Sequence, residues 1–178
     1  MKLKLSAIFL CVLFIAAVEA RATILPDSCG DDSVRFNVKT TKNKTPLPSP
    51  PDGKAQVVLI ENENQMIGPF MYATIRYGMD GAWVGANNNN SYFVVSVDPG
   101  VHHLCVAWQS GIGKLKKSID VAKFTAEAGK VYYFAADVKV IPCGENCANF
   151  DFGLSQLDDD EGAYRVKAWK FASATQDK

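Results

Sequence analysis

The first candidates for chemistry in this 178-residue chain are the adjacent histidines His102 and His103, and the cysteines Cys143 and Cys147 of the segment CGENC. A hydrolytic triad holds a nucleophile, a base and an orienting acid together. Adjacent histidines supply one base at most, and no Gly-x-Ser-x-Gly nucleophile motif is present. The segment GIGK, at Gly111–Lys114, lacks the rest of a phosphate-binding loop. The sequence therefore predicts no catalytic residue, no cofactor and a protein that is not an enzyme.

The spacing of CGENC is compatible with a disulfide, a redox pair or half of a metal site. Redox enzymes use Cys-x-x-Cys at the start of a helix, whereas three residues separate Cys143 from Cys147. A zinc ion needs two further ligands. His102 and His103 are poor candidates for them, because neighbouring residues of a strand point to opposite faces. We favour a structural disulfide and no metal site, with free thiols as an open alternative.

The N-terminus has the pattern of a secretory signal peptide. Two lysines precede an apolar run over 5–18, and small residues surround a cleavage point after Ala20 or Ala22. The alternative, a transmembrane anchor, needs about 20 apolar residues, and Glu19 closes this run early. We expect residues 1–20 to be removed. The mature chain would then be exported, periplasmic or secreted, without a transmembrane helix.

Four cysteines remain after that cleavage. Their even number in an exported chain favours disulfides, and four cysteines allow three pairings. If CGENC closes on itself, the other bond joins the N-terminal segment to a core strand. Neither Cys11 nor the first remaining cysteine follows a small-residue box, so we expect no lipid anchor. The cysteines predicted to form disulfides are Cys29, Cys105, Cys143 and Cys147.

The charge balance excludes some partner classes. Removing residues 1–20 takes two lysines and one glutamate from 19 basic and 19 acidic residues, which leaves a formal charge of −1. Binders of nucleic acid or anionic membranes usually carry a basic stripe. We expect no nucleic-acid partner, but an envelope or extracellular protein, peptide or polysaccharide.

Strand signals dominate after a proline-rich stretch. Residues 23–53 read as an extended N-terminal segment and linker, with four prolines between Thr45 and Gly53. From Ala55 onward, short β-branched segments are separated by turn signals such as Asp80-Gly81 and Asp98-Pro99-Gly100. This pattern predicts a mainly β domain over 54–174. We expect an antiparallel β-sandwich of about 7–8 short strands, with a barrel as the alternative.

One C-terminal helix is expected within DDDEGAYRVKAWKFA. Asp158 and Glu161 have the spacing of a capping box. A calcium site is the alternative use of these acids. They lack the alternating oxygens of a calcium loop, so we favour the cap.

Several segments in succession resemble the bacterial DUF2846 domain, a family without an assigned function. They are PPDGKAQVVLIEN, DGAWVG, NSYFVVSVDPGVHHLCV and FTAEAGKVYYFAADV, and they run with LDDDEGAYRV over about residues 51–170. The strand, Asp-Gly, strand and Pro-Gly order is also similar to the PEGA-type repeat. The resemblance implies an exported sandwich-like domain, often carried on lipoproteins. This chain lacks the lipid-attachment cysteine, and IPCGENCANFDFG is an addition.

These observations favour a binding or interaction module of the cell envelope. A structural accessory protein that pairs through a sheet edge is the alternative, and a metal- or thiol-dependent enzyme is a third. Aromatic residues on strands pack in cores or line binding surfaces. The candidate binding surface consists of Trp83, Trp108, Tyr132, Tyr133, His102 and His103.

Overall fold

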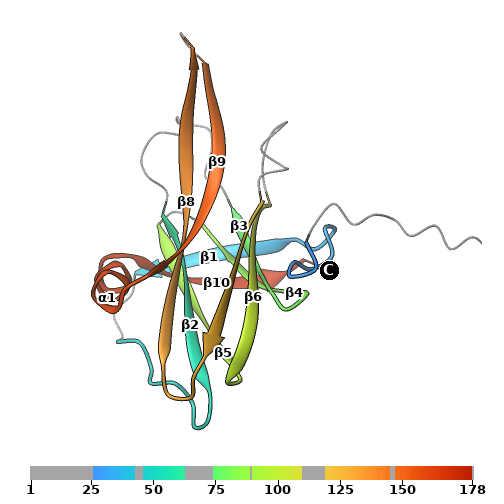
Figure 1. Ribbon diagram of the computed structural model, residues 1–178. Coiled ribbons are helices and arrows are strands. Elements are labelled where there is room, and N and C mark those ends of the chain that lie inside the picture. The colour runs from blue at the N-terminus through green and yellow to red at the C-terminus, as the bar shows by residue number, and fades with distance from the viewer. Residues whose placement is uncertain are drawn as a thin grey trace, which may run out of the picture.

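Strands dominate the computed structural model, which describes residues 26–42, 46–62, 74–88, 90–109, 119–144 and 147–177 (Figure 1). The predicted signal peptide and the segment Gly111–Lys114 lie outside these residues. The described elements are β1 (Phe36–Lys42), β2 (Ala55–Asn62), β3 (Ile75–Met79), β4 (Ala82–Asn87), β5 (Ser91–Val97), β6 (Gly100–Trp108), β7 (Ile119–Ala126), β8 (Val131–Gly144), β9 (Cys147–Leu157), α1 (Asp159–Ala168) and β10 (Lys170–Gln176). The predicted mainly β sandwich with one helix is confirmed.

The strands form two sheets. The six-stranded sheet has the order β1-β10-β5-β2-β8-β9, and the four-stranded sheet has the order β4-β3-β6-β7. Most neighbours are antiparallel, but β2 pairs with β8, and β10 with β5, in parallel. In Figure 1, β1 and β10 run across the direction of β2 and β8. The described part of the chain thus has more strands than the seven or eight expected, and two parallel pairings.

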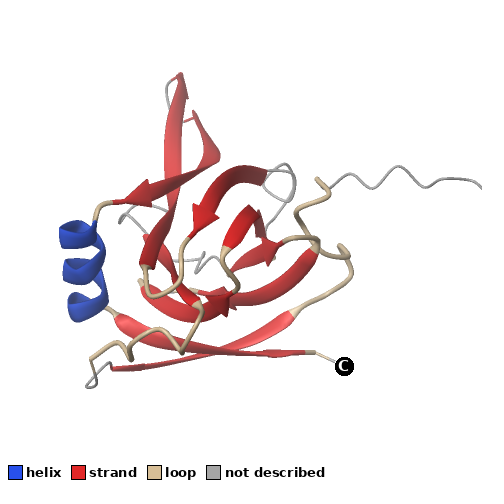
Figure 2. Cartoon of the chain, turned by 60° about the horizontal axis from the view of Figure 1, so that its bottom comes forward, coloured by secondary structure: helices blue, strands red, loops and turns tan. Residues whose placement is uncertain are grey.

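Both faces of the six-stranded sheet are covered. Seven of the eight residues of β2 are buried, which agrees with the apolar run in the centre of AQVVLIEN. The inner face includes Leu59 and Phe134 and packs on the four-stranded sheet, which contributes Tyr77 to the same core. The outer face forms a smaller core with Tyr133 and Val166 beneath α1, which lies beside the sheet in Figure 2.

The helix begins as the sequence predicts. The Asp158 side chain accepts a hydrogen bond from the Glu161 N–H at 2.8 Å, which is a helix N-cap. The chain leaves the helix at Trp169 and enters β10 directly. Strand β10 then pairs along its length with β1, which makes the N-terminal segment part of the six-stranded sheet.

The residues before β1 cover the outer face of the four-stranded sheet. Cys29 and Cys105 form a disulfide, with Cα atoms 5.3 Å apart. The segment passes so close to β3 that a Cβ atom at Gly78 would lie 3.0 Å from both the Cys29 Cα and the Ser28 carbonyl oxygen. Glycine permits this approach. The covering segment leaves the β6–β7 side of the same face open.

Strands β8 and β9 continue beyond the sandwich. Pairing of β8 with β2 ends at Asp137, opposite Asn62. Among the described residues, 138–144 pair only with β9, and Figure 1 shows this two-stranded extension projecting from the body. We call residues 138–144 and 147–152 the hairpin arm. No helix in the described ranges has the length and apolar character needed to cross a bilayer.

Candidate binding groove

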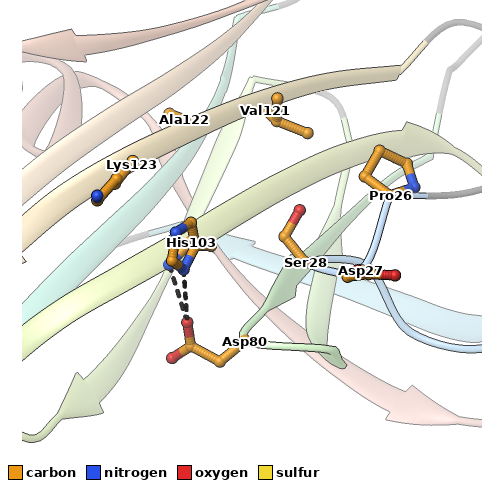
Figure 3. A pocket seen from close by; sticks show the side chains of 8 residues that line it. All are labelled: Pro26, Asp27, Ser28, Asp80, His103, Val121, Ala122 and Lys123. Carbon is orange, nitrogen blue, oxygen red and sulfur yellow. Dashed lines mark hydrogen bonds and ion pairs between the residues drawn. The ribbon is translucent and has the colours of Figure 1, made fainter.

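An open groove of about 800 Å³ lies on the outer face of the four-stranded sheet, between the N-terminal segment and β6–β7 (Figure 3). One wall is the start of the covering segment, which the Cys29–Cys105 disulfide fixes in place. The other wall is the exposed face of the β6–β7 ladder. The lining residues are Pro26, Asp27, Ser28, Asp80, His103, Val121, Ala122 and Lys123.

The register of β6 and β7 places a basic and an apolar position next to one another. His103 pairs with Lys123, and Cys105 with Val121, and paired residues share a face. Val121 is 50% exposed, and the His103 side chain is 55% exposed. Val101, two residues before His103, is exposed to a similar extent. This wall therefore offers apolar surface and two basic side chains to solvent.

The floor of the groove contains Asp80, whose carboxylate is held on both oxygens. Oδ1 accepts a hydrogen bond from the His103 N–H at 2.8 Å, and Oδ2 lies 2.6 Å from Nδ1 of His102. The Asp80 N–H donates to the His103 carbonyl at 3.0 Å. Asp80 has a φ of 51°, a conformation that aspartate tolerates in turns. The Asp80-Gly81 turn thus has a second role beyond reversing the chain.

His102 joins two turns at the base of β6. Its Nδ1 contacts the Asp80 carboxylate, and its Nε2 lies 2.8 Å from the Asp98 carbonyl oxygen. The ring lies 5.5 Å from the ring of Phe124, and the side chain is only 13% exposed. Burial opposes the charged ring. The hydrogen bonds and charges of Asp80 and Asp98 outweigh it, so the pKa of His102 is raised above its ordinary value.

The carboxylates on either side of His102 are both stabilised as anions. Burial opposes ionisation of Asp80, but hydrogen bonds from His103 and His102 lower its pKa below the ordinary value. Asp98 lies 2.6 Å from the Lys54 ammonium, and this hydrogen bond and charge lower the pKa of Asp98. Acidic and basic side chains therefore alternate at the base of the groove, in the order Asp80, His102, Asp98 and Lys54.

His102 is not placed to act as a general base. An Asp-His pair activates a nucleophile through the second ring nitrogen, but in His102 that nitrogen contacts the Asp98 carbonyl. Among the described residues, no three histidine, cysteine, aspartate or glutamate side chains gather as metal ligands. The groove offers surface and charge for binding.

The predicted binding-surface tryptophans lie in different places. Trp83 is half-buried under the N-terminal segment, where its Nε1 donates to the Asp31 carbonyl at 2.6 Å. Trp108 is 2% exposed and belongs to the inner core. Both therefore support the fold.

The two tyrosines lie on opposite faces of β8. The Tyr132 ring packs 5.3 Å from Phe124 against the inner core. Tyr133 is 8% exposed in the outer core, close to Val166 of α1. Of the predicted binding-surface residues, the structure brings only His103 to the groove lining and His102 to its base.

A second buried polar cluster lies where β5 begins, at the other end of the sandwich. The Tyr77 hydroxyl donates to the Ile60 carbonyl at 2.8 Å, and the Asn87 amide donates to the Leu59 carbonyl at 3.1 Å. Burial and the nearby charge of Glu61 raise the pKa of Tyr77 well above its ordinary value. These bonds satisfy strand carbonyls, so we assign the cluster a structural role.

The disulfide predictions agree with the structure wherever it describes the cysteine side chains. Cys29 is bonded to Cys105, and both are buried. Cys143 is exposed and is also disulfide-bonded. The side chain of Cys147 lies outside the described residues, so its pairing with Cys143 stays a prediction.

Sequence reasoning did not identify the groove residues Asp80, Val121 and Lys123. Asp80 reads as a turn residue, and Val121 and Lys123 are unremarkable on an alternating strand. One sequence signal was present: Asp80 lies in the turn after β3, and Asp98 lies in the turn before β6, the strand that contains both histidines. The pairing of β3 with β6 brings the Asp80 turn next to these histidines, and the sequence alone does not reveal that pairing.

Comparison of the chain with family models, with curated proteins and with solved structures finds no match. The resemblance to the DUF2846 domain is therefore neither supported nor contradicted, and it stays a prediction.

Proposed function

We propose that this protein is an exported, non-enzymatic binding module that holds an extended polypeptide segment of an envelope or extracellular partner in the groove. The observation that carries the proposal is the open β6–β7 wall. There Val121 is half exposed beside His103 and Lys123, facing a segment fixed by a disulfide.

An extended peptide fits the spacing of this wall. Val101 and His103 alternate on one face of β6, as Val121 and Lys123 do on β7. Side chains of an extended ligand repeat with the same two-residue period. A ligand whose every second residue switches between apolar and polar would therefore meet apolar and basic positions in turn.

Disulfides support the exported location. Buried disulfides persist in oxidising compartments and are rare in the cytosol. Cys29–Cys105 encloses a loop with a sequence separation of 76 residues. In the chain-entropy account, such a loop contributes about 4 kcal/mol to stability.

Selection of binding peptides tests the proposal. Random seven-residue peptides would be selected on the wild-type protein and then tested on Val121→Asp. The matched control is Tyr164→Asp, which changes another exposed apolar residue, 71% exposed on α1. We expect Val121→Asp to weaken binding at least tenfold and Tyr164→Asp to leave it unchanged. Equal effects of the two changes, or a failure to select any peptide, would contradict the proposal.

Strand pairing through the hairpin arm is the second candidate function. Within the described residues, 138–142 pair with β9 alone, so the described part of the chain leaves there an edge of the kind that strand addition uses. Deletion of residues 139–151 tests this candidate in the same selection. Loss of peptide binding on deletion, with Val121→Asp unaffected, would assign binding to the arm.

A further inference from the structure

We propose that His102 is a protonation-controlled clamp that makes the groove selective for acidic ligands, with tight binding while its ring is charged and weaker binding once the ring is neutral. The inference rests on the proposed groove function and adds a ligand class and a regulatory group to it. The contacts of the His102 ring carry it.

Both neighbours of the His102 ring accept hydrogen bonds. The Asp80 carboxylate lies 2.6 Å from Nδ1, and the Asp98 carbonyl oxygen lies 2.8 Å from Nε2. A neutral imidazole donates from only one nitrogen. Only the imidazolium ion satisfies both contacts, and loss of its proton brings a nitrogen lone pair against a carboxylate or carbonyl oxygen.

Two turns and two strands contribute the groups that surround His102. Asp80 approaches from the β3–β4 turn, and Asp98 from the β5–β6 turn, where Lys54 pairs with its carboxylate. On β6 the neighbour is His103, and β7 contributes the uncharged ring of Phe124. Two imidazoles therefore face Asp80: Nδ1 of His102 lies 2.6 Å from the carboxylate, and Nδ1 of His103 lies 3.9 Å from it, so His102 is the nearer cation.

That balance determines the charge of the groove. With His102 protonated, the negative charge of Asp80 is neutralised, and the exposed basic groups His103 and Lys123 dominate the β6–β7 wall. In Figure 3 the Ser28 hydroxyl is directed toward β7, whereas the Asp27 side chain is directed to one side, along the N-terminal segment. When His102 is neutral, Asp80 loses its nearest cation, and its negative charge on the groove floor repels an acidic ligand.

The charge complementarity selects a peptide with carboxylates between apolar residues. A suitable probe is a labelled five-residue peptide with valine at positions 1 and 5, glutamate at position 3 and serine between them, which places the valines and the glutamate on one face. Its counterpart has glutamine at position 3. A unit charge about 4 Å away changes binding by about fivefold when water screens the pair as fully as in bulk solvent. We expect the glutamate probe to bind about fivefold more weakly at pH 8.5 than at pH 5.5. The glutamine probe should change little.

Two adjacent histidines provide a matched pair of variants. Because His103 itself lines the groove, His103→Gln should weaken the glutamate probe at pH 5.5 but preserve a pH effect. His102→Gln should remove most of it. Asp80→Asn keeps an amide oxygen for the His103 N–H but removes the charge, so it should also flatten the pH profile.

The outcomes separate the inference from the function on which it rests. Groove binding with the same pH ratio in wild type, His102→Gln and Asp80→Asn would overturn the clamp and leave the binding function intact. Failure of both probes, together with failure of the peptide selection, would overturn the binding function. As a ligand-free readout, the His102 ring should titrate at higher pH in wild type than in Asp80→Asn by NMR. An unchanged midpoint would also overturn the clamp.

Discussion

Arg76 stacks on Trp83, with the guanidinium carbon 4.3 Å from the ring centroid. The same guanidinium donates to the carbonyls of Asp32 and Val34 and to the Asp32 carboxylate. The Arg76 side chain is only 2% exposed, because it starts from a strand that lies beneath the N-terminal segment. Arg76 thus connects the N-terminal segment, which forms one wall of the groove, to the four-stranded sheet.

Replacing Arg76 with lysine should lower the free energy of unfolding by about 2 kcal/mol. An ammonium group cannot reproduce the planar fork that reaches several acceptors while it stacks on an aromatic ring. Urea unfolding measures the change. The matched control is Arg35→Lys, since Arg35 contacts carbonyls within its own segment, and its effect should stay below about 0.5 kcal/mol. Equal effects would show that Arg76 does not anchor the segment.

Local patterns were sufficient to predict much of the fold. The alternation in β5 and the turn at Asp98-Pro99-Gly100 depend on neighbouring residues, so they are readable from sequence. The cap at Asp158 is equally local. Strand β10 was not predicted, because FASATQ has weak strand signals and is held by pairing with β1, more than a hundred residues away in sequence.

The groove was less predictable because, like β10, it depends on residues that are distant from one another in sequence. His102 and His103 were identified as candidates, but their contacts come from turns that are separate in sequence from one another. Trp108 and Tyr133 are aromatic residues on strands, and sequence alone does not distinguish a core position from a binding surface. Their burial depends on the second sheet and on α1, respectively.

The His102 clamp should make stability depend on pH in a defined direction. A raised histidine pKa contributes stability that is complete below the unfolded value of about 6.5 and is lost as the pH rises through the folded value. The lowered pKa of Asp80 contributes stability that is lost in acid, below its ordinary value of 3.8. The Asp80–His102 pair should therefore contribute most to the free energy of unfolding between about pH 3.8 and pH 6.5.

The loss on the alkaline side should be about 1 kcal/mol, because Asp80 is 44% exposed and solvent screens the pair. Urea unfolding of wild type and His102→Gln from pH 5 to 9 measures it. The difference between the two proteins should shrink as the pH rises above about 6.5. A difference that stays constant across this range would contradict the assigned protonation.

The disulfide bond of Cys143 should be more reactive than the Cys29–Cys105 bond. Cys143 is exposed, whereas Cys29 is 5% exposed and Cys105 is fully buried. Thiol–disulfide exchange requires access of the attacking thiolate to sulfur. Brief treatment with a low concentration of dithiothreitol, followed by alkylation and peptide mass analysis, should therefore label Cys143 first. Prior labelling of Cys29 would contradict the described packing.

Gly162 lies against the ring of Tyr133, at the contact between α1 and the six-stranded sheet. A Cβ atom at this position would overlap the Tyr133 ring. Alanine normally favours a helix over glycine by about 1 kcal/mol. The overlap costs about 1–3 kcal/mol in a packed site, so Gly162→Ala should destabilise the protein by about 1 kcal/mol.

The sign of the Gly162 effect should depend on Tyr133. In a Tyr133→Ala background the ring is absent, so only the helix propensity remains and Gly162→Ala should stabilise by about 0.5–1 kcal/mol. A double-mutant cycle measured by urea unfolding isolates this coupling. Lys167→Ala, an exposed change on the same helix, should be within about 0.5 kcal/mol of neutral in both backgrounds. If Gly162→Ala has the same effect with and without the tyrosine ring, then α1 does not pack on β8 through this contact.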